Sequence, residues 1–137
     1  MGPQALRVAG IRKALRALGH AVDDFGDIDV ESSKIDLPEP PPGSLARNWP
    51  EIRAWAALLA HRAYELMGEG YRPLFLGGDH SISIGTVSGV ARACREAGRP
   101  LFVLWLDAHA DFNTNQLTPS GNIHGMPVAC LCGHGPQ

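Results

Sequence analysis

Long hydrophobic runs are absent from this 137-residue chain, whose apolar stretches, such as 55–60 and 101–106, reach only about six residues. A transmembrane helix needs about 20 apolar residues in succession, so no membrane span is expected. The N-terminal residues also lack the apolar core of a signal peptide. These absences predict a cytoplasmic protein with no membrane partner.

An excess of charge of one sign is also lacking, because 12 Lys and Arg face 14 Asp and Glu for a net charge of −2. Without a basic stripe, nucleic acid is not an expected partner. The three cysteines cannot all pair, and such a scattered set is typical of a reducing compartment. Cys130 and Cys132 with His134 match no common zinc-finger spacing; they are read either as a zinc-binding fragment or, as we favour, as small apolar side chains.

Helical patterns alternate with short apolar runs. We predict helices over 3–18, 49–67 and 81–97, strands over 73–76 and 101–106, an extended segment at 20–25, and a short helix or strand start at 126–132. The apolar stripe of the second helix includes Trp55, which we expect in the core. This alternation predicts an α/β protein with a parallel sheet and flanking helices.

The Pro-rich segment 37–44 can hold neither a helix nor a central strand, so we expect a surface loop within a single domain. With only about three strands, the sheet would expose its edges and apolar faces. We therefore expect marginal stability or a partner that covers them.

Three polar side chains, Asp107, His109 and Asp111, follow the second strand. In extended backbone, side chains at i, i+2 and i+4 point the same way, about 7 Å apart. Mixed carboxylate and imidazole ligands suit Mn, Fe or Zn better than Ca or Mg. The sequence therefore predicts a metal site; the alternative is a polar loop with two solvated carboxylates and a surface histidine.

A second cluster, G-G-D-H-S from Gly77, follows the first strand. Open parallel sheets bind their ligands at the carboxyl ends of the strands, where both clusters are expected. His80 would be a fourth metal ligand, and Asp79 could orient an imidazole. The alternative is a glycine-rich turn in which Asp79 or Ser81 caps the next helix. A phosphate site is not favoured, because neither G-x-G-x-x-G nor G-x-x-x-x-G-K-[ST] is present.

A third cluster, S-G-N-I-H-G from Ser120, ends a loop that starts near Asn113 and is rich in amides and hydroxyls. Such a loop can wrap a polar ligand. His124 is a candidate proton shuttle, because histidine titrates near neutral pH. The alternative is a loop histidine without a role.

Together, G-G-D-H-S, D-A-H-A-D-F-N and S-G-N-I-H-G resemble the arginase family of ureohydrolases, over nearly the whole chain. The D-F-N continuation and the S-G-N-x-H-G loop are similar to arginase rather than agmatinase. The resemblance implies a three-layer α/β/α fold, hydrolysis of L-arginine to L-ornithine and urea, and a homo-oligomer, either a trimer or a hexamer.

The resemblance also implies two Mn²⁺ ions per complete site. His80 and Asp111 would bind the first ion, His109 the second, and Asp107 both. A hydroxide held between the ions would attack the guanidinium carbon of L-arginine, and Asp111 would carry its proton to the leaving amine.

The remaining roles that the resemblance implies concern protons and substrate. His124 would relay protons between the leaving amine and bulk water. Asn113, Ser120 and Asn122 would hold the α-carboxylate and α-amino end of arginine, which sets the distance from the guanidinium to the metal.

The family pattern continues with D-x-D-x-x-D-P, which supplies two more ligand carboxylates, and with a Glu that pairs with the guanidinium. Neither is found in these 137 residues, and D-I-D at 27–29 does not replace them. We expect 1–137 to be a single partial domain, an internal or truncated part of such a protein, with weak or no activity alone. The alternatives are another ureohydrolase (an agmatinase or guanidino-acid hydrolase), a catalytically inactive metal-binding truncation, and a fragment without a stable fold.

Overall fold

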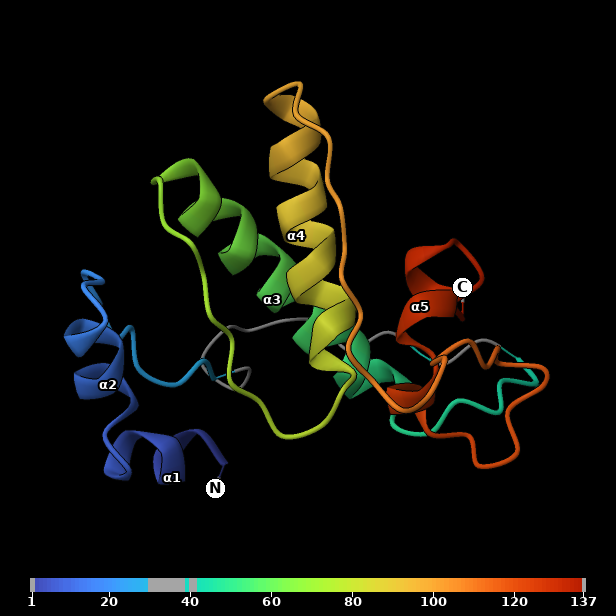
Figure 1. Ribbon diagram of the computed structural model, residues 1–137. Coiled ribbons are helices and arrows are strands. Elements are labelled where there is room, and N and C mark those ends of the chain that lie inside the picture. Colours follow the sequence, from blue (N-terminus) through green and yellow to red (C-terminus); the bar gives the residue numbers. More distant parts are fainter. Residues whose placement is uncertain (1, 30–38, 40–41, 137) are drawn as a thin grey trace.

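The described residues, 2–29, 39 and 42–136 of a computed structural model, are organised around two packed helices (Figure 1). In chain order the helices are α1 (Gly2–Val8), α2 (Ile11–Ala17), α3 (Trp49–Gly68), α4 (Ile82–Glu96) and α5 (Pro127–Leu131), with a 3₁₀ turn η2 (Ile123–Gly125) before α5. None of these helices combines the length and apolarity that crossing a bilayer requires. Half of the Pro-rich segment 37–44, residues 37–38 and 40–41, lies outside the described residues.

The first predicted helix, 3–18, is divided in the structure. Gly10 has φ 87°, a left-handed conformation that glycine adopts without the steric cost of a side chain. The amide of Gly10 donates to the carbonyl of Arg7 (3.0 Å), which ends α1, and α2 begins one residue later. The prediction of one continuous helix was therefore wrong.

Helices α3 and α4 pack closely through small residues of α4. A Cβ added to Gly85 would lie 2.8 Å from the Cβ of Leu59, and one added to Gly89 would lie 2.7 Å from the Cβ of Ala63. Glycine weakens an isolated helix, but here it lets the two backbones approach each other. This contact explains why α4 forms although its first half has a poor helix-forming composition.

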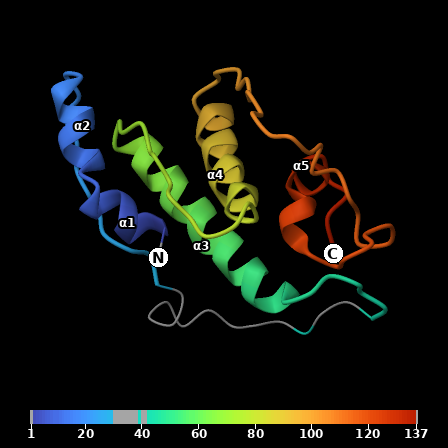
Figure 2. The same ribbon diagram turned by 60° about the horizontal axis from the view of Figure 1, so that its bottom comes forward.

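The two segments predicted as strands form no strand-to-strand hydrogen bonds among the described residues. Residues 73–76 and 101–106 are extended, but no ladder joins either of them to another described segment. Residues 101–106 run beside α4 (Figure 1), whereas 73–76 pass along α3 toward the start of α4 (Figure 2), and both segments line one groove with Phe75, Val87 and Phe102. A strand is stabilised by hydrogen bonds to a neighbouring strand. Since the described chain offers none, the predicted parallel sheet is not shown here.

The remaining short segments differ in outcome. Residues 20–25 form no regular secondary structure, and Phe25 meets the ring of Tyr71 edge-on with centroids 5.2 Å apart. Residues 126–132 contain α5, so the helical alternative for this segment is confirmed.

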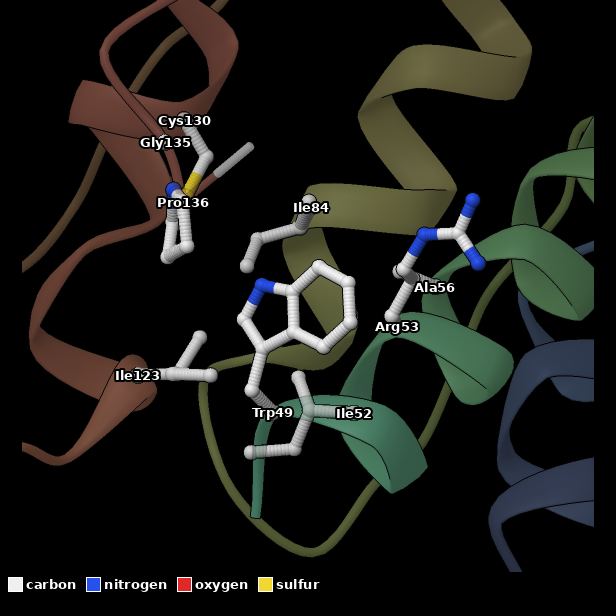
Figure 3. Close-up of a pocket in the computed structure, with 9 residues that line it drawn as sticks. All are labelled: Trp49, Ile52, Arg53, Ala56, Ile84, Ile123, Cys130, Gly135 and Pro136. Atoms are coloured by element: carbon white, nitrogen blue, oxygen red, sulfur yellow. The ribbon is translucent and has the colours of Figure 1, made fainter. Parts of the chain in front are cut away.

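The core that supports the loop before α5 is small. It consists of Trp49, Ile123 and Met126, which are all buried. Trp55, the expected core residue of α3, is instead 38 % exposed. Figure 3 shows the Trp49 ring between Ile84 of α4 and Ile123, beside a cavity of about 320 Å³. None of the predicted site residues lines this cavity.

The close approach of α3 and α4 predicts that Gly89→Ala destabilises the chain. The added Cβ would overlap Ala63, so the free energy of unfolding should fall by about 1–3 kcal/mol. The matched control is Gly68→Ala in α3, where an added Cβ would meet nothing within 4 Å. Urea unfolding followed by helical circular dichroism measures both variants. Equal midpoints for the two would contradict this packing.

Candidate metal centre

The turn after 73–76 places His80 at the start of α4. Asp79 accepts a hydrogen bond from the backbone N–H of Ser81 (2.9 Å), and Ser83 donates its hydroxyl to the His80 carbonyl (2.7 Å). Neither Asp79 nor Ser81 caps α4 with its side chain, because Ser81 stands at the N-cap and no side-chain capping hydrogen bond reaches the first turn. The effect of these bonds is to fix the backbone of His80 at the end of the turn.

The segment after 101–106 holds its carboxylates through local hydrogen bonds. Asp107 accepts the backbone N–H of His109 (2.8 Å). Asp111 has φ 49°, and its carbonyl accepts from the amides of Val128 (3.0 Å) and Ala129 (3.3 Å) in α5. Asp is one of the few residues that tolerates this left-handed conformation, because its short side chain can bond locally. Asp111 is thereby anchored to α5 and buried, with 7 % exposure.

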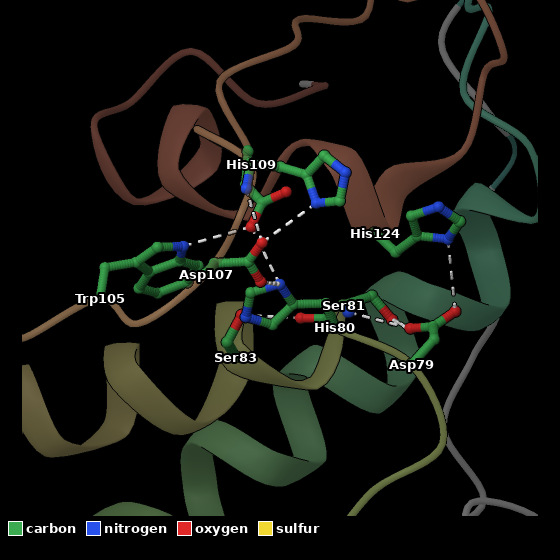
Figure 4. Close-up of polar contacts among 9 residues, drawn as sticks. Asp79, His80, Ser81, Ser83, Trp105, Asp107, His109 and His124 are labelled. Carbon is green, nitrogen blue, oxygen red and sulfur yellow. Dashed lines mark hydrogen bonds and ion pairs between the residues drawn. The ribbon is translucent and has the colours of Figure 1, made fainter.

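Three of the four predicted metal ligands meet at one point, and Figure 4 shows two of them, His80 and Asp107, facing each other. The ring nitrogen Nδ1 of His80 lies 2.9 Å from Asp111 Oδ2 and 3.2 Å from Asp107 Oδ2. One ligand atom from each of these residues falls within 4.8 Å of the others. They come from two segments that are more than twenty residues apart in sequence, so it is the fold that assembles them.

The fourth predicted ligand, His109, lies beside this group rather than within it. Its Nδ1 is 3.1 Å from the Oδ1 atom of Asp107, and its side chain is 82 % exposed. The two oxygens of Asp107 therefore face two different imidazoles. His80 lies on one side and His109 on the other.

The charge state of Asp107 favours a ligand role. The backbone N–H of His109 is the main cause that holds the pKa of this carboxyl below its usual range, and the imidazoles of His109 and His80 act in the same direction. Partial burial opposes the shift without cancelling it. Asp107 is therefore ionised throughout the neutral range and available to bind a cation.

Trp105 is a site residue that the sequence reasoning missed. Its indole N–H donates to Asp111 Oδ2 at 3.2 Å, and its ring stacks on that of His80 with centroids 4.8 Å apart at 27°. The signal was present in the sequence, because Trp105 stands two residues before Asp107 and so shares its face of the extended segment.

His124, the predicted proton shuttle, lies apart from the group of three. Its Nδ1 is 3.9 Å from Asp79 Oδ2, and both side chains are about half exposed. Figure 4 shows the two side chains facing each other on the far side of His80 from Trp105. The imidazole that Asp79 faces is thus His124.

The three predicted substrate contacts lie on one closed loop. The backbone N–H of Asn113 donates to the backbone carbonyl of Gly125 (3.1 Å), and this hydrogen bond joins the two ends of the loop. Ser120 Oγ accepts the amide of Asn122 (3.2 Å). Asn113 and Ser120 are exposed and Asn122 is half-buried, so their polar groups are accessible to a ligand.

A second residue without a sequence signal, Asn115, ties this loop to the segment before α3. Its Oδ1 accepts from the hydroxyl of Ser44 (3.0 Å) and the amides of Leu45 (2.8 Å) and Ala46 (3.0 Å). The sequence around Asn115 gives no indication that its side chain accepts hydrogen bonds from the distant segment 44–46. These bonds fix the position of the loop that carries the predicted substrate contacts.

A mixed carboxylate and imidazole centre of this kind is typical of metal-dependent hydrolases. The sequence matches the Arginase family over residues 1–136, and the chain belongs to this family. It is 45 % identical to an arginase of Brucella melitensis over 133 residues, which are 97 % of this chain and 42 % of the relative. It is 42 % identical to the arginase of Bacillus subtilis over 137 residues, which are 100 % of this chain and 43 % of the relative.

Solved structures agree with the sequence comparison. An arginase from Bacillus cereus superimposes with a TM-score of 0.82 at 41 % identity, covering 98 % of this chain and 42 % of that one. An Entamoeba histolytica arginase in complex with L-ornithine gives 0.71 at 34 % identity, over 99 % of this chain and 43 % of that one. The chain thus spans about two fifths of the length of the relatives it matches.

The left-handed backbone of Asp111 predicts different costs for two substitutions. Asp111→Ala should lower the free energy of unfolding by about 1–2 kcal/mol more than Asp111→Asn, because Asn tolerates positive φ. Asn also keeps an oxygen for the Trp105 N–H. Thermal or urea unfolding compares the two variants. The same loss in both would show that neither the backbone conformation nor the retained oxygen matters for stability.

Proposed function

We propose that this chain supplies the metal-binding part of an arginase, which hydrolyses L-arginine to L-ornithine and urea at a binuclear manganese centre. The observation that carries the proposal is the group of His80, Asp107 and Asp111 in a member of the arginase family. A relative of similar fold holds L-ornithine, the product of this reaction. A cytoplasmic homo-oligomer is part of the same proposal.

The donor set fits manganese. Two carboxylates and an imidazole, with a second imidazole beside them, combine the oxygen and nitrogen ligands that Mn²⁺ accepts. Because each oxygen of Asp107 faces a different imidazole, this carboxylate suits a bridging role, with His80 and Asp111 serving one ion and His109 the other. When bound, such ions make water acidic enough to supply a nucleophile at neutral pH.

The other side chains of the site handle protons and orientation. Asp111 is buried next to His80, so it can take a proton from the nucleophile and deliver it to the leaving amine. His124 is exposed and paired with Asp79, so its ring can exchange protons between that amine and bulk water. Asp111 and His124 are therefore the two residues to which we assign catalytic roles.

The closed loop orients the substrate. Asn113, Ser120 and Asn122 offer amide and hydroxyl groups to the α-carboxylate and α-amino groups of arginine. Holding that end fixes where the guanidinium lies relative to the metal, so that the reaction becomes effectively intramolecular. Agmatine has no carboxylate, so an agmatinase would not need a loop that binds one.

The exposed apolar segments belong to the same proposal. Phe102 is 90 % exposed, Leu104 81 % and Leu106 86 %, and their extended backbone is not paired with another described segment. We assign 73–76 and 101–106 to strands of a parallel sheet that forms in a chain of the relatives' length. Residues 1–137 are then one partial domain of an α/β/α fold.

A chimera tests the proposed reaction. Residues 1–137 replace the aligned part of the Bacillus subtilis arginase, which supplies the rest of the domain. We expect Mn²⁺-dependent release of urea from L-arginine, and Asp107→Asn should abolish most of it because the bridging carboxylate is lost. Asp23→Asn, which neutralises a carboxylate that accepts a hydrogen bond from Tyr71 away from the metal centre, is the matched control.

Two results would contradict this account. One is a folded chimera that binds manganese but releases no urea from arginine. The other is robust urea release by the isolated 137-residue chain, whose three grouped ligands are too few for two ions. Alone, this chain should bind Mn²⁺ with little or no turnover, as the inactive metal-binding alternative also expects.

Substrate choice is tested in the same chimera by Asn122→Ala. If Asn122 holds the α-carboxylate end, kcat/KM for arginine should fall by about 10–100-fold, a loss of about 1.4–2.7 kcal/mol that is typical of a hydrogen bond to a charged group. Activity toward agmatine should change little. An equal loss for both substrates would favour the agmatinase or guanidino-acid alternative.

A further inference from the structure

We infer that Trp105 is a positioning residue of the metal centre, which holds His80 and Asp111 in ligating orientation through its indole. The inference rests on the proposed metal-dependent function. It concerns a side chain that is not itself a ligand, because indole offers an N–H donor and no lone pair for a cation.

The first contact is the hydrogen bond from the indole N–H to Asp111 Oδ2, at 3.2 Å. A carboxylate can rotate about its last bond, and a single donor on one oxygen limits that rotation. The same oxygen is 2.9 Å from His80 Nδ1. The indole N–H therefore fixes the carboxylate that faces the imidazole.

The second contact is the stack of the indole on the imidazole of His80, with centroids 4.8 Å apart and an interplanar angle of 27°. The ring of His80 could otherwise turn about its Cβ–Cγ bond, because its side chain is 35 % exposed. A flat surface against one face restricts this turning and keeps Nδ1 directed at the two carboxylates.

One side chain thus restrains two ligands that come from different segments. Figure 4 shows the indole of Trp105 beside the imidazole of His80, and the indole N–H donates to the Asp111 carboxylate. Partners that orient metal ligands typically contribute 10–100-fold to metal affinity.

Two substitutions separate the two contacts. Trp105→Phe keeps an aromatic ring for stacking and removes the N–H donor, whereas Trp105→Leu removes both. Mn²⁺ affinity of the 137-residue chain is measured from the electron paramagnetic resonance signal of the free ion. We expect affinity to fall about 10-fold in the Phe variant and about 100-fold in the Leu variant.

The matched control is Trp55→Phe, which changes a tryptophan on α3 that is 38 % exposed and outside the metal centre. Its Mn²⁺ affinity should be unchanged. Circular dichroism and the thermal midpoint report the fold of each variant. If the Leu variant fails to fold, the Phe variant still tests the N–H contact.

Fluorescence shows independently whether the bound ion lies next to Trp105. Mn²⁺ is paramagnetic and quenches a nearby indole, so titration should quench the emission of the unsubstituted chain and of Trp55→Phe. Trp105→Phe should lose most of this quenching, because the indole stacked on the ligand is gone.

Two results would overturn the inference about Trp105 without contradicting the proposed function. One is Mn²⁺ binding of equal strength in the unsubstituted chain and the Phe and Leu variants. The other is an equal loss of affinity in Trp105→Phe and Trp55→Phe, which would indicate a general effect of losing tryptophan. If the unsubstituted chain bound no Mn²⁺, the metal centre itself and this inference with it would be contradicted.

Discussion

The site depends on how Asp111 is held. Its left-handed backbone turns the chain at the end of the extended segment 101–106, and its carbonyl receives two amide hydrogen bonds from α5. Its buried carboxylate receives the Trp105 N–H and faces His80. A single residue thereby joins the start of α4, the second extended segment and α5. A conformation with a steric cost persists only where the surroundings fix it from several sides, which is common at functional sites.

The helices were largely predictable because they depend on local sequence. The structure has α3 at Trp49–Gly68 and α4 at Ile82–Glu96, against predictions of 49–67 and 81–97. Apolar spacing and the glycines that end helices are short-range signals. The exception is Gly10, where a glycine inside an apparently helical pattern adopts positive φ and divides the helix.

The sheet was not predictable in the same way, because a strand depends on partners far away in sequence. Residues 73–76 and 101–106 have the apolar composition of buried strands, and they are extended as expected. What they lack among the described residues is a neighbour with which to form hydrogen bonds. Phe102, at 90 % exposure, shows the consequence, since a side chain with the pattern of a sheet core faces solvent.

The candidate site divides in a similar way. The three clusters were visible as motifs, but the extended i, i+2, i+4 arrangement expected from Asp107 is not followed, because the backbone bends at 108–109 and Asp111 has positive φ. The same spacing points to Trp105, but a tryptophan in an apolar run was read only as core. We expected His80 to join Asp107 and Asp111 because both clusters follow predicted strands. The structure brings the three residues together although those segments are not paired with each other in the described chain.

The most direct test of the central claim is anomalous diffraction at the manganese edge from crystals of the 137-residue chain grown with Mn²⁺. The account predicts an anomalous peak within ligating distance of His80 Nδ1 and the carboxylates of Asp107 and Asp111, with Trp105 stacked on the imidazole. A peak elsewhere, for example beside Cys130, Cys132 and His134, or no peak in the group of three, would contradict it.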